Sequence, residues 1–376
     1  MPAEATAKLP RIEARAWTLV DARTGETLAS HAVARPLPIA STTKLMTAYV
    51  VLHELPLDRI VRAAPYDAEY GESLLGLRPG QRISVRDLLY GLILRSGNDA
   101  AYDLARAAAG SERRFVAQMN RYAAALGLAD THYANPIGLD QRGNHSSARD
   151  LATLSRRLLA IPAFARIADA RSAVLRSIRP PRRIESINEL LEMAPWVTGV
   201  KTGHTFGALY VLVGSGRRNG VGLVSVAIGA PTDENRFRDN LDLLEYGFSQ
   251  YRRRVPVRAG RALAEPSIRY SGGTLPLRAG RTVAVGLRPG QRLSVAVRAP
   301  GEVEGPVRRD ADLGVATVSV DGRRTATVAL QAGRAVPEAS ALDRARSFTE
   351  ENLVWFALLL SAILVSGAFL LRRLFR

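Results

Sequence analysis

Strands at both ends of the first 250 residues enclose a run of helices. Alternating apolar residues predict five strands, at 16–21, 27–30, 198–205, 208–215 and 221–228. Amphipathic periodicity predicts six helices, at 42–55, 85–94, 99–109, 112–126, 147–159 and 232–248. Asn219-Gly220 joins the last two strands, and this dipeptide is a strong hairpin signal. The pattern indicates an α+β fold with one antiparallel five-stranded sheet and a helical insertion.

Residues 255–338 have a different character. Short alternating runs at 282–287, 292–297, 316–320 and 325–330 are separated by Gly, Pro and Asp, and the helical period is absent. Runs of this kind are typical of a small all-β sandwich. We therefore expect an α+β domain at 14–254 followed by an all-β module at 255–338.

An uncharged run of 19 residues, 353–371, lies close to the C-terminus. At ~1.5 Å per residue it would be about 28 Å long as a helix, enough to cross a hydrocarbon core. Aromatic residues stand near its start and three arginines follow its end, as at membrane interfaces. The sequence predicts a linker at 339–352, a transmembrane helix at 353–371 and a cytoplasmic basic tail at 372–376. The two domains before the helix would then be extracytoplasmic.

This topology requires a secretory signal, yet the first seven residues have no apolar core. Ala5-Thr6-Ala7 does resemble the small-residue end of a signal peptide. We interpret residues 1–13 as the remnant of such a segment, with the true start upstream. The alternative is a tail-anchored protein that faces the cytoplasm, which the basic tail argues against.

Lysine is rare in this basic chain. Of 52 Lys and Arg residues, set against 35 Asp and Glu, only Lys8, Lys44 and Lys201 are lysines. Arginine keeps its proton in proteins, whereas a desolvated lysine can act as a base near neutral pH. The two internal lysines are therefore candidate chemical groups. Cysteine is absent, which excludes disulfides, zinc–thiolate sites, Fe–S clusters and thiol nucleophiles.

Both internal lysines fall in short motifs. The first is Ser41-Thr42-Thr43-Lys44 at a predicted helix start, where Ser and Lys would share one helix face and Lys could take the serine proton. The second is Lys201-Thr202-Gly203 in a strand, where glycine leaves room for a ligand backbone. Between them, Ser96-Gly97-Asn98 forms a predicted turn between two helices. Each motif alone also fits a plain helix cap or strand.

Together, Ser-x-x-Lys, Ser-x-Asn and Lys-Thr-Gly in this order resemble the penicillin-binding proteins, serine DD-peptidases and β-lactamases. The surrounding residues are most similar to the D-alanyl-D-alanine carboxypeptidases, which are low-molecular-weight penicillin-binding proteins. The stretches that carry this similarity are 39–48, 85–104, 131–139, 145–151 and 199–205. The resemblance covers roughly residues 14–250 and extends more loosely to the all-β module.

The resemblance implies a role for each matching residue near the scissile bond. Ser41 would be the acylated nucleophile and Lys44 its general base. Ser96 would relay a proton to the leaving amine, and Asn98 would hold the peptide carbonyl. The backbone N–H groups of Ser41 and His204 would form the oxyanion hole.

The resemblance also implies a binding site for the substrate's terminal carboxylate. Lys201 and Thr202 would donate to it, beside the open strand position of Gly203. An arginine of the last helix of the domain would receive it as well, with Arg236 the best match and Arg238 the fallback. Thr198 stands where relatives often have Asp, and we expect this change to affect strand packing more than chemistry.

The implied activity is serine-type D-Ala-D-Ala carboxypeptidation of peptidoglycan stem pentapeptides, without metal or cofactor, and with β-lactams as acylating inhibitors. A DD-endopeptidase of cross-linked peptidoglycan, a weak transpeptidase and a non-catalytic membrane-anchored wall-binding protein remain alternatives. A class A β-lactamase needs a glutamate for deacylation, and residues 113–184 contain none. None of the five histidines shows metal-ligand spacing. A nucleic-acid partner is not expected, because the arginines form no clustered arm.

Overall fold

The computed structural model describes residues 8–351, 357–358, 361–363 and 367. By internal contacts the chain divides into two compact units, Met1–Arg252 and Arg253–Arg376. Among the described residues, the first unit contains both strands and helices, and the second contains strands followed by the helix at 341–351.

In the first unit the strands of the main sheet come before and after a helical region, as the sequence predicts, and four short strands, β3 to β6, interrupt that region. The bounds of the elements are β1 (Ala16–Asp21), β2 (Thr27–His31), the 3-10 helix η1 (Ala40–Thr43), α1 (Lys44–Glu54), β3 (Ile60–Arg62), β4 (Arg82–Ser84), α2 (Val85–Leu94), α3 (Asn98–Ala109), α4 (Glu112–Ala125), α5 (Ala148–Leu159), α6 (Pro162–Ala168), β5 (Ser172–Leu175), β6 (Arg182–Glu185), α7 (Leu190–Met193), β7 (Val197–Thr205), β8 (Leu209–Arg218), β9 (Val221–Ala230) and α8 (Asp233–Ser249).

The predicted five-stranded antiparallel sheet is confirmed, with the strand order β2-β1-β9-β8-β7. The N-terminal strand β1 lies beside β9, so the two ends of the domain meet in the centre of the sheet. Strand β7, which carries the Lys-Thr-Gly motif, is an edge strand of this sheet. The two-stranded ribbons β3–β4 and β5–β6 were not predicted, because strands of three or four residues are too short to show a period.

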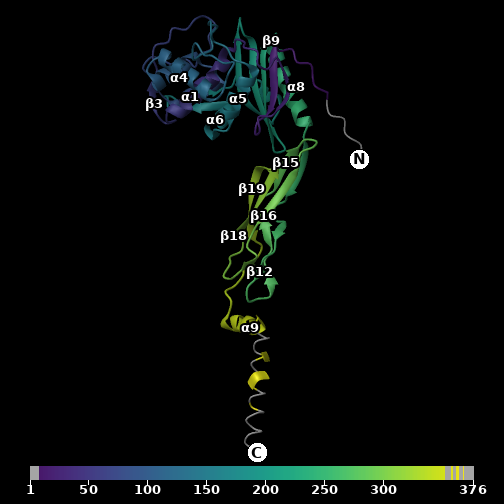
Figure 1. The fold of residues 1–376 in the computed structure, drawn as a ribbon. Coiled ribbons are helices and arrows are strands. Elements are labelled where there is room, and N and C mark those ends of the chain that lie inside the picture. Colours follow the sequence, from purple (N-terminus) through teal and green to yellow (C-terminus); the bar gives the residue numbers. More distant parts are fainter. Residues whose placement is uncertain (1–7, 352–356, 359–360, 364–366, 368–376) are drawn as a thin grey trace, which may run out of the picture. The chain divides into compact units, whose positions relative to one another are not determined.

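Helices cover both faces of the sheet (Figure 1). Successive strand residues point to opposite faces, so Leu212 packs under α8 while its neighbours Val211 and Val213 belong to the core on the helical-insertion side. Helix α5 lies on that second face. The sheet is therefore buried on both sides and gives a rigid support for residues at its edge.

Side-chain caps fix where several helices begin. The hydroxyls of Ser84, Ser147 and Thr232 accept hydrogen bonds from the backbone N–H three residues later, at 3.2, 3.2 and 3.1 Å. Such caps satisfy N–H groups that have no partner inside the helix. The starts of α2, α5 and α8 consequently lie within one residue of those predicted from the sequence.

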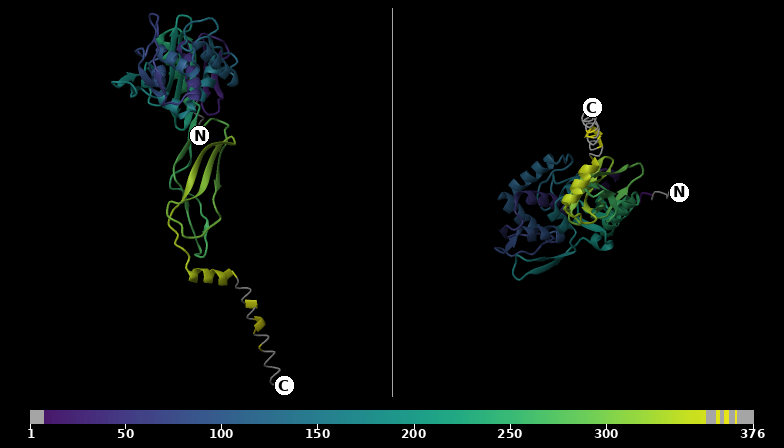
Figure 2. Two further views of the ribbon diagram at one scale, coloured as in Figure 1. Left: turned by 90° about the vertical axis from the view of Figure 1, so that its left-hand side faces the viewer. Right: turned by 90° about the horizontal axis from the view of Figure 1, so that it is seen from below.

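In the described residues of the second unit, strands precede the helix α9. The elements are β10 (Arg252–Val257), β11 (Ala262–Ala264), β12 (Ser267–Ile268), β13 (Gly273–Thr274), β14 (Leu277–Ala279), β15 (Val283–Leu287), β16 (Leu293–Arg298), β17 (Glu302–Val303), β18 (Asp312–Val320), β19 (Arg323–Ala332) and α9 (Ala341–Glu351). Five strands pair in the order β11-β14-β19-β18-β16, three pair as β13-β12-β17, and β10 pairs with β15. The paired long strands β18 and β19 can be followed in Figure 2. Side chains from all three sheets share one apolar core.

The predicted membrane span at 353–371 and the basic tail at 372–376 fall almost entirely outside the described residues, as do residues 1–7 of the predicted N-terminal remnant. Within the described part of the chain, no helix has the length and apolar character needed to cross a membrane. The predicted linker is helical where α9 runs.

Candidate active site

Ser41 and Lys44 form a hydrogen-bonded pair at the start of the first long helix. Ser41 lies in η1, and Lys44 is the first residue of α1. The Lys44 Nζ donates to Ser41 Oγ at 2.8 Å and to the Ile137 carbonyl oxygen at 2.6 Å. Lys44 is completely buried, while Ser41 is partly exposed. A hydroxyl that is open to a ligand therefore touches an amine that is shielded from water.

The loop after α4 holds the lysine from the other side. Asn135 Oδ1 accepts from the backbone N–H of Gly138 at 2.6 Å, which closes the turn that presents the Ile137 carbonyl. Gly138 has φ +94°, and a Cβ there would lie 2.0 Å from the Ala40 carbonyl oxygen, so only glycine fits. This stretch lies within residues 131–139, which resemble the carboxypeptidases in sequence but contain none of the three motifs.

Burial changes the acid–base behaviour of Lys44. Desolvation disfavours the charged amine and lowers the pKa of Lys44 from 10.5 to about 7. The carboxylates of Glu72 and Asp99 act in the opposite direction and keep the pKa from falling further. An amine with this pKa is present in both protonation states near neutral pH, as a general base requires.

Ser96 and Lys201 form a second hydroxyl–amine pair. Ser96 lies in the predicted turn between α2 and α3, with φ +57°. The Lys201 Nζ donates to Ser96 Oγ at 2.9 Å and to the Thr202 carbonyl oxygen at 2.7 Å. All three residues are buried. Burial lowers the pKa of Lys201 well below 10.5, and the positive charges of Lys44 and Arg236 lower it further.

Gly203 allows β7 to touch the turn that contains Ser41. A Cβ at Gly203 would lie 2.9 Å from the backbone nitrogen of Ser41 and 3.2 Å from the Ile39 carbonyl oxygen. Any other residue would push the edge strand away from the serine. The glycine of the Lys-Thr-Gly motif is therefore required for packing within the chain, in addition to the room for a ligand that the sequence predicts.

Arg236, rather than Arg238, reaches β7. Its Nη1 donates to the Gly203 carbonyl oxygen at 3.2 Å, and it forms an ion pair with Asp233. Its side chain is only 12% exposed, and its buried Nε has no partner among the described residues. Arg238 pairs instead with Glu234 at 2.7 Å on the exposed side of α8. Arg236 is therefore better placed than Arg238 to receive the substrate's terminal carboxylate.

The remaining predicted site residues lie on or beside β7. Thr202 is buried, whereas the His204 side chain is exposed and its ring stacks on Tyr210 with centroids 4.3 Å apart. Thr198 bonds through its hydroxyl to Ser215 of β8 at 2.9 Å. The structure therefore brings the three motifs to one place at the edge of the sheet.

Asn98 has a partner that sequence reasoning missed. The residue is 4% exposed at the start of α3, and its Nδ2 donates to Glu72 Oε2 at 2.6 Å. Its Oδ1 is buried and has no partner among the described residues. Glu72 lies 26 residues before Asn98, between β3 and β4, in a segment without motif or predicted element. Glu72 therefore carries no local signal in the sequence that would mark it as a site residue.

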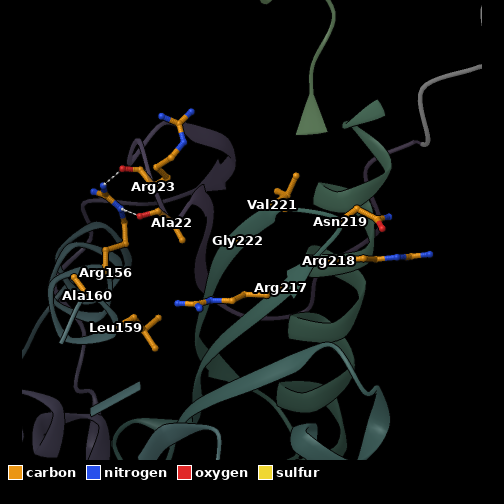
Figure 3. Close-up of a pocket in the computed structure, with 11 residues that line it drawn as sticks. Ala22, Arg23, Arg156, Leu159, Ala160, Arg217, Arg218, Asn219, Val221 and Gly222 are labelled. Atoms are coloured by element: carbon orange, nitrogen blue, oxygen red, sulfur yellow. Dashed lines mark hydrogen bonds between the residues drawn. The ribbon is translucent and has the colours of Figure 1, made fainter. Parts of the chain in front are cut away.

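A cavity of about 570 Å³ in the first unit is separate from this site. Four of its lining residues are arginines, and Figure 3 shows Arg217 extending toward the side of Arg156 and Leu159. Arg217 lies six residues along β8 from Val211, which pairs with Gly203, so the cavity is about 20 Å from the motifs. It contains no serine–lysine pair, and acyl-transfer chemistry is therefore expected at Ser41.

The fold of this chain is similar to those of solved penicillin-binding proteins. Penicillin-binding protein 6B of Escherichia coli has the same fold, with a TM-score of 0.62, 31% identity and coverage of 86% of this chain and 97% of that one. The Streptomyces K15 DD-transpeptidase matches with a TM-score of 0.62, 31% identity and coverage of 65% of this chain and all of that one. The class is thus that of the penicillin-binding proteins.

Residues 3–232 match the sequence model of the peptidase S11 family, D-alanyl-D-alanine carboxypeptidase. The D-alanyl-D-alanine carboxypeptidase DacC of Escherichia coli strain K12 is 39% identical over 269 residues, which are 68% of this chain and 66% of that protein. The chain belongs to the peptidase S11 family of D-alanyl-D-alanine carboxypeptidases.

Proposed function

We propose that this serine D-alanyl-D-alanine carboxypeptidase removes the terminal D-Ala of peptidoglycan stem pentapeptides through an acyl-enzyme on Ser41. The observation that carries the proposal is the 2.8 Å contact between Ser41 Oγ and the buried Lys44 Nζ. A neutral amine at this distance can accept the hydroxyl proton as the oxygen attacks. The family supplies the substrate class.

In the acylation step, Ser41 Oγ attacks the carbonyl carbon of the penultimate D-Ala while Lys44 Nζ takes the serine proton. The negative oxygen of the tetrahedral intermediate would be stabilised by the backbone N–H groups of Ser41 and His204. Collapse breaks the peptide bond, and the proton that Lys44 took from Ser41 is relayed by Ser96, which lies 2.9 Å from Lys201, to the leaving D-Ala amine, so that Lys44 and Ser96 return to their starting protonation states. Water then hydrolyses the ester and restores the Ser41 hydroxyl.

The carboxylate of the terminal D-Ala would bind near Lys201, Thr202 and Arg236. Arg236 lies against the Gly203 carbonyl, and its buried Nε has no partner in the described part of the chain. Burying a guanidinium nitrogen without a partner is costly, so a carboxylate there would satisfy it. Asn98 would hold the peptide carbonyl on the other side of the scissile bond.

Replacing Arg236 should weaken substrate binding more than chemistry. In Arg236→Ala we expect KM for a pentapeptide to rise by about tenfold or more, because a charge-assisted hydrogen bond contributes ~1.5–3 kcal/mol. A penicillin does not present its carboxylate in the same geometry as the terminal D-Ala of the peptide. Its rate of acylation should therefore change less than the KM for the pentapeptide. Arg238→Ala is the matched control and should behave as wild type. Equal effects of the two substitutions would contradict the assignment of Arg236.

Carboxypeptidase, endopeptidase and transpeptidase activities share one acyl-enzyme. The first two differ in the amine that leaves, a terminal D-Ala or the cross-linking residue, and transpeptidation differs from both in using an amine instead of water as acceptor. The chain should be offered a pentapeptide ending in D-Ala-D-Ala and, separately, a cross-linked dimer. Release of free D-Ala as the main product is expected. Cleavage of the dimer alone would support the endopeptidase alternative. Binding of wall fragments without any product would support the wall-binding alternative.

We also propose that residues 353–371 attach the chain to the membrane. The catalytic domain at 14–254, the all-β module at 255–338 and the linker at 339–352 would lie on the extracytoplasmic side. The tail at 372–376 would lie in the cytoplasm. The uncharged run of 19 residues followed by arginines supports this topology. The full chain should remain in the membrane fraction after alkaline carbonate washing. Its release by that wash would contradict the proposal.

A further inference from the structure

We propose that Glu72 is a positioning residue of this active site, which fixes the side-chain amide of Asn98 so that one Nδ2 hydrogen faces the substrate's peptide carbonyl. The inference rests on the proposed function and extends it to a residue outside the three motifs. It starts from the 2.6 Å contact between Glu72 Oε2 and Asn98 Nδ2.

The segment that carries Glu72 is tied to the start of α3. The backbone N–H of Asn98 donates to the Ser73 carbonyl oxygen at 2.8 Å. The next residue, Asp99, accepts through Oδ1 from the backbone N–H of Leu75 at 2.7 Å. From the opposite side, Arg182 Nη2 donates to the Leu75 carbonyl oxygen at 2.8 Å. The segment that follows Glu72 is therefore bonded to the start of α3 on one side and to Arg182 on the other, and this holds Glu72 next to Asn98.

The carboxylate of Glu72 is itself fixed as an acceptor. Its Oε2 accepts from the Tyr66 hydroxyl at 2.6 Å as well as from Asn98, and its Oε1 accepts from the backbone N–H of Glu69 at 3.0 Å. Partial burial raises the pKa of Glu72, but the hydrogen bonds from Tyr66 and Asn98 outweigh it and hold the pKa below 4.5. Glu72 is thus ionised and accepts only.

An ionised carboxylate decides which way the Asn98 amide faces. An asparagine side chain has a donor end and an acceptor end of nearly equal shape, and the surrounding hydrogen bonds select between the two orientations. Glu72 can accept but cannot donate, so Nδ2 must face it. One Nδ2 hydrogen then serves Glu72, and the other is free for a substrate carbonyl. In the flipped orientation Oδ1 would take its place and would repel that carbonyl.

The negative charge of Glu72 supplies an independent readout. Lys44 is influenced by the carboxylates of Glu72 and Asp99, which raise its pKa, and Lys201 lies close enough for the two lysines to influence each other. Arg236 adds positive charge on the Lys201 side. Removing the charge of Glu72 should lower the pKa of Lys44. The acid limb of the pH–rate profile should then move to lower pH, an effect that a purely structural residue would not produce.

The experiment compares Glu72→Ala and Glu72→Gln in the full chain. Glutamine can still accept from Asn98 but has no charge. We expect Glu72→Ala to lower the second-order rate of acylation by penicillin about tenfold or more, since a misdirected amide leaves a buried polar group unpaired. Glu72→Gln should recover most of this loss, and both variants should show an acid limb at lower pH. Glu54→Gln is the matched control, because Glu54 also accepts from a tyrosine hydroxyl, that of Tyr122, at 2.8 Å.

Thermal unfolding of each variant shows that loss of rate is not loss of fold. A wild-type acylation rate in Glu72→Ala would overturn the inference whether or not the acid limb moves, because Asn98 would then be oriented without Glu72. A Glu72→Gln variant as slow as Glu72→Ala would also overturn the inference. An acceptor for the Asn98 amide would then be present without restoring the acylation rate. If wild type itself forms no adduct, the proposed function fails instead, and the two failures are distinguishable.

Discussion

The Ser41→Ala variant should form no covalent adduct with a penicillin and should release no D-Ala from a pentapeptide. Ser41 is the partly exposed hydroxyl that bonds to a buried lysine, whereas Ser96, the hydroxyl of the second pair, is buried. Removing a serine nucleophile typically costs on the order of 10⁴-fold or more in rate. Fluorescent penicillin and gel detection measure the effect directly.

Ser271→Ala is the matched control for that variant. Ser271 is an exposed serine of the second unit, outside the proposed machinery. It should label as wild type. Labelling of Ser41→Ala at a rate near that of the control would mean that another residue is the nucleophile.

Replacing Lys44 with arginine should have the second largest effect. Arginine keeps the positive charge but cannot release its proton at neutral pH, so it cannot take the Ser41 proton. Loss of a general base typically costs 10²–10⁴-fold, and we expect acylation by penicillin to fall by about 10³-fold. Lys8→Arg is the control, since Lys8 is exposed and outside the motifs. A Lys44→Arg variant with rates near wild type would contradict the role of Lys44 as base.

The wild-type pH profile tests the same role without mutation. Burial lowers the pKa of Lys44 to about 7. The neutral amine, which is the form that accepts a proton, is the minor form below that pH and the major form above it. The value of kcat/KM should therefore rise with pH, reach half its plateau near pH 7, and lose this limb in Lys44→Arg.

The sequence predicted the sheet and the three motifs because each has a local signal. The strand and helix periods are strong where elements are long, and the two internal lysines stand out among 52 basic residues that are almost all arginine. The pairing of Ser41 with Lys44 follows from spacing on one turn. Lys201 and Ser96 are separated by 105 residues, and no local signal in the sequence predicts that they pair.

The contacts that the sequence could not predict are those made by irregular segments. Glu72 lies between the short strands β3 and β4. Its position depends on its own bond to Asn98 and on the bonds from Leu75 and Gly76 to Asp99, which leave no trace in hydrophobic periodicity. The Ile137 carbonyl that holds Lys44 is a backbone group, so its side chain gives no hint of the contact. Side chains in irregular segments and backbone carbonyl groups can be assigned to the site only from the folded structure, in which distant loops lie together.

The most direct test of the account is intact-mass analysis of the full chain after exposure to a penicillin, followed by peptide mapping and by incubation of fresh enzyme with a pentapeptide ending in D-Ala-D-Ala. We predict one penicilloyl group per chain, located on Ser41, and release of one D-Ala per pentapeptide. An unmodified chain, or an adduct on a residue other than Ser41, would contradict the acyl-enzyme mechanism.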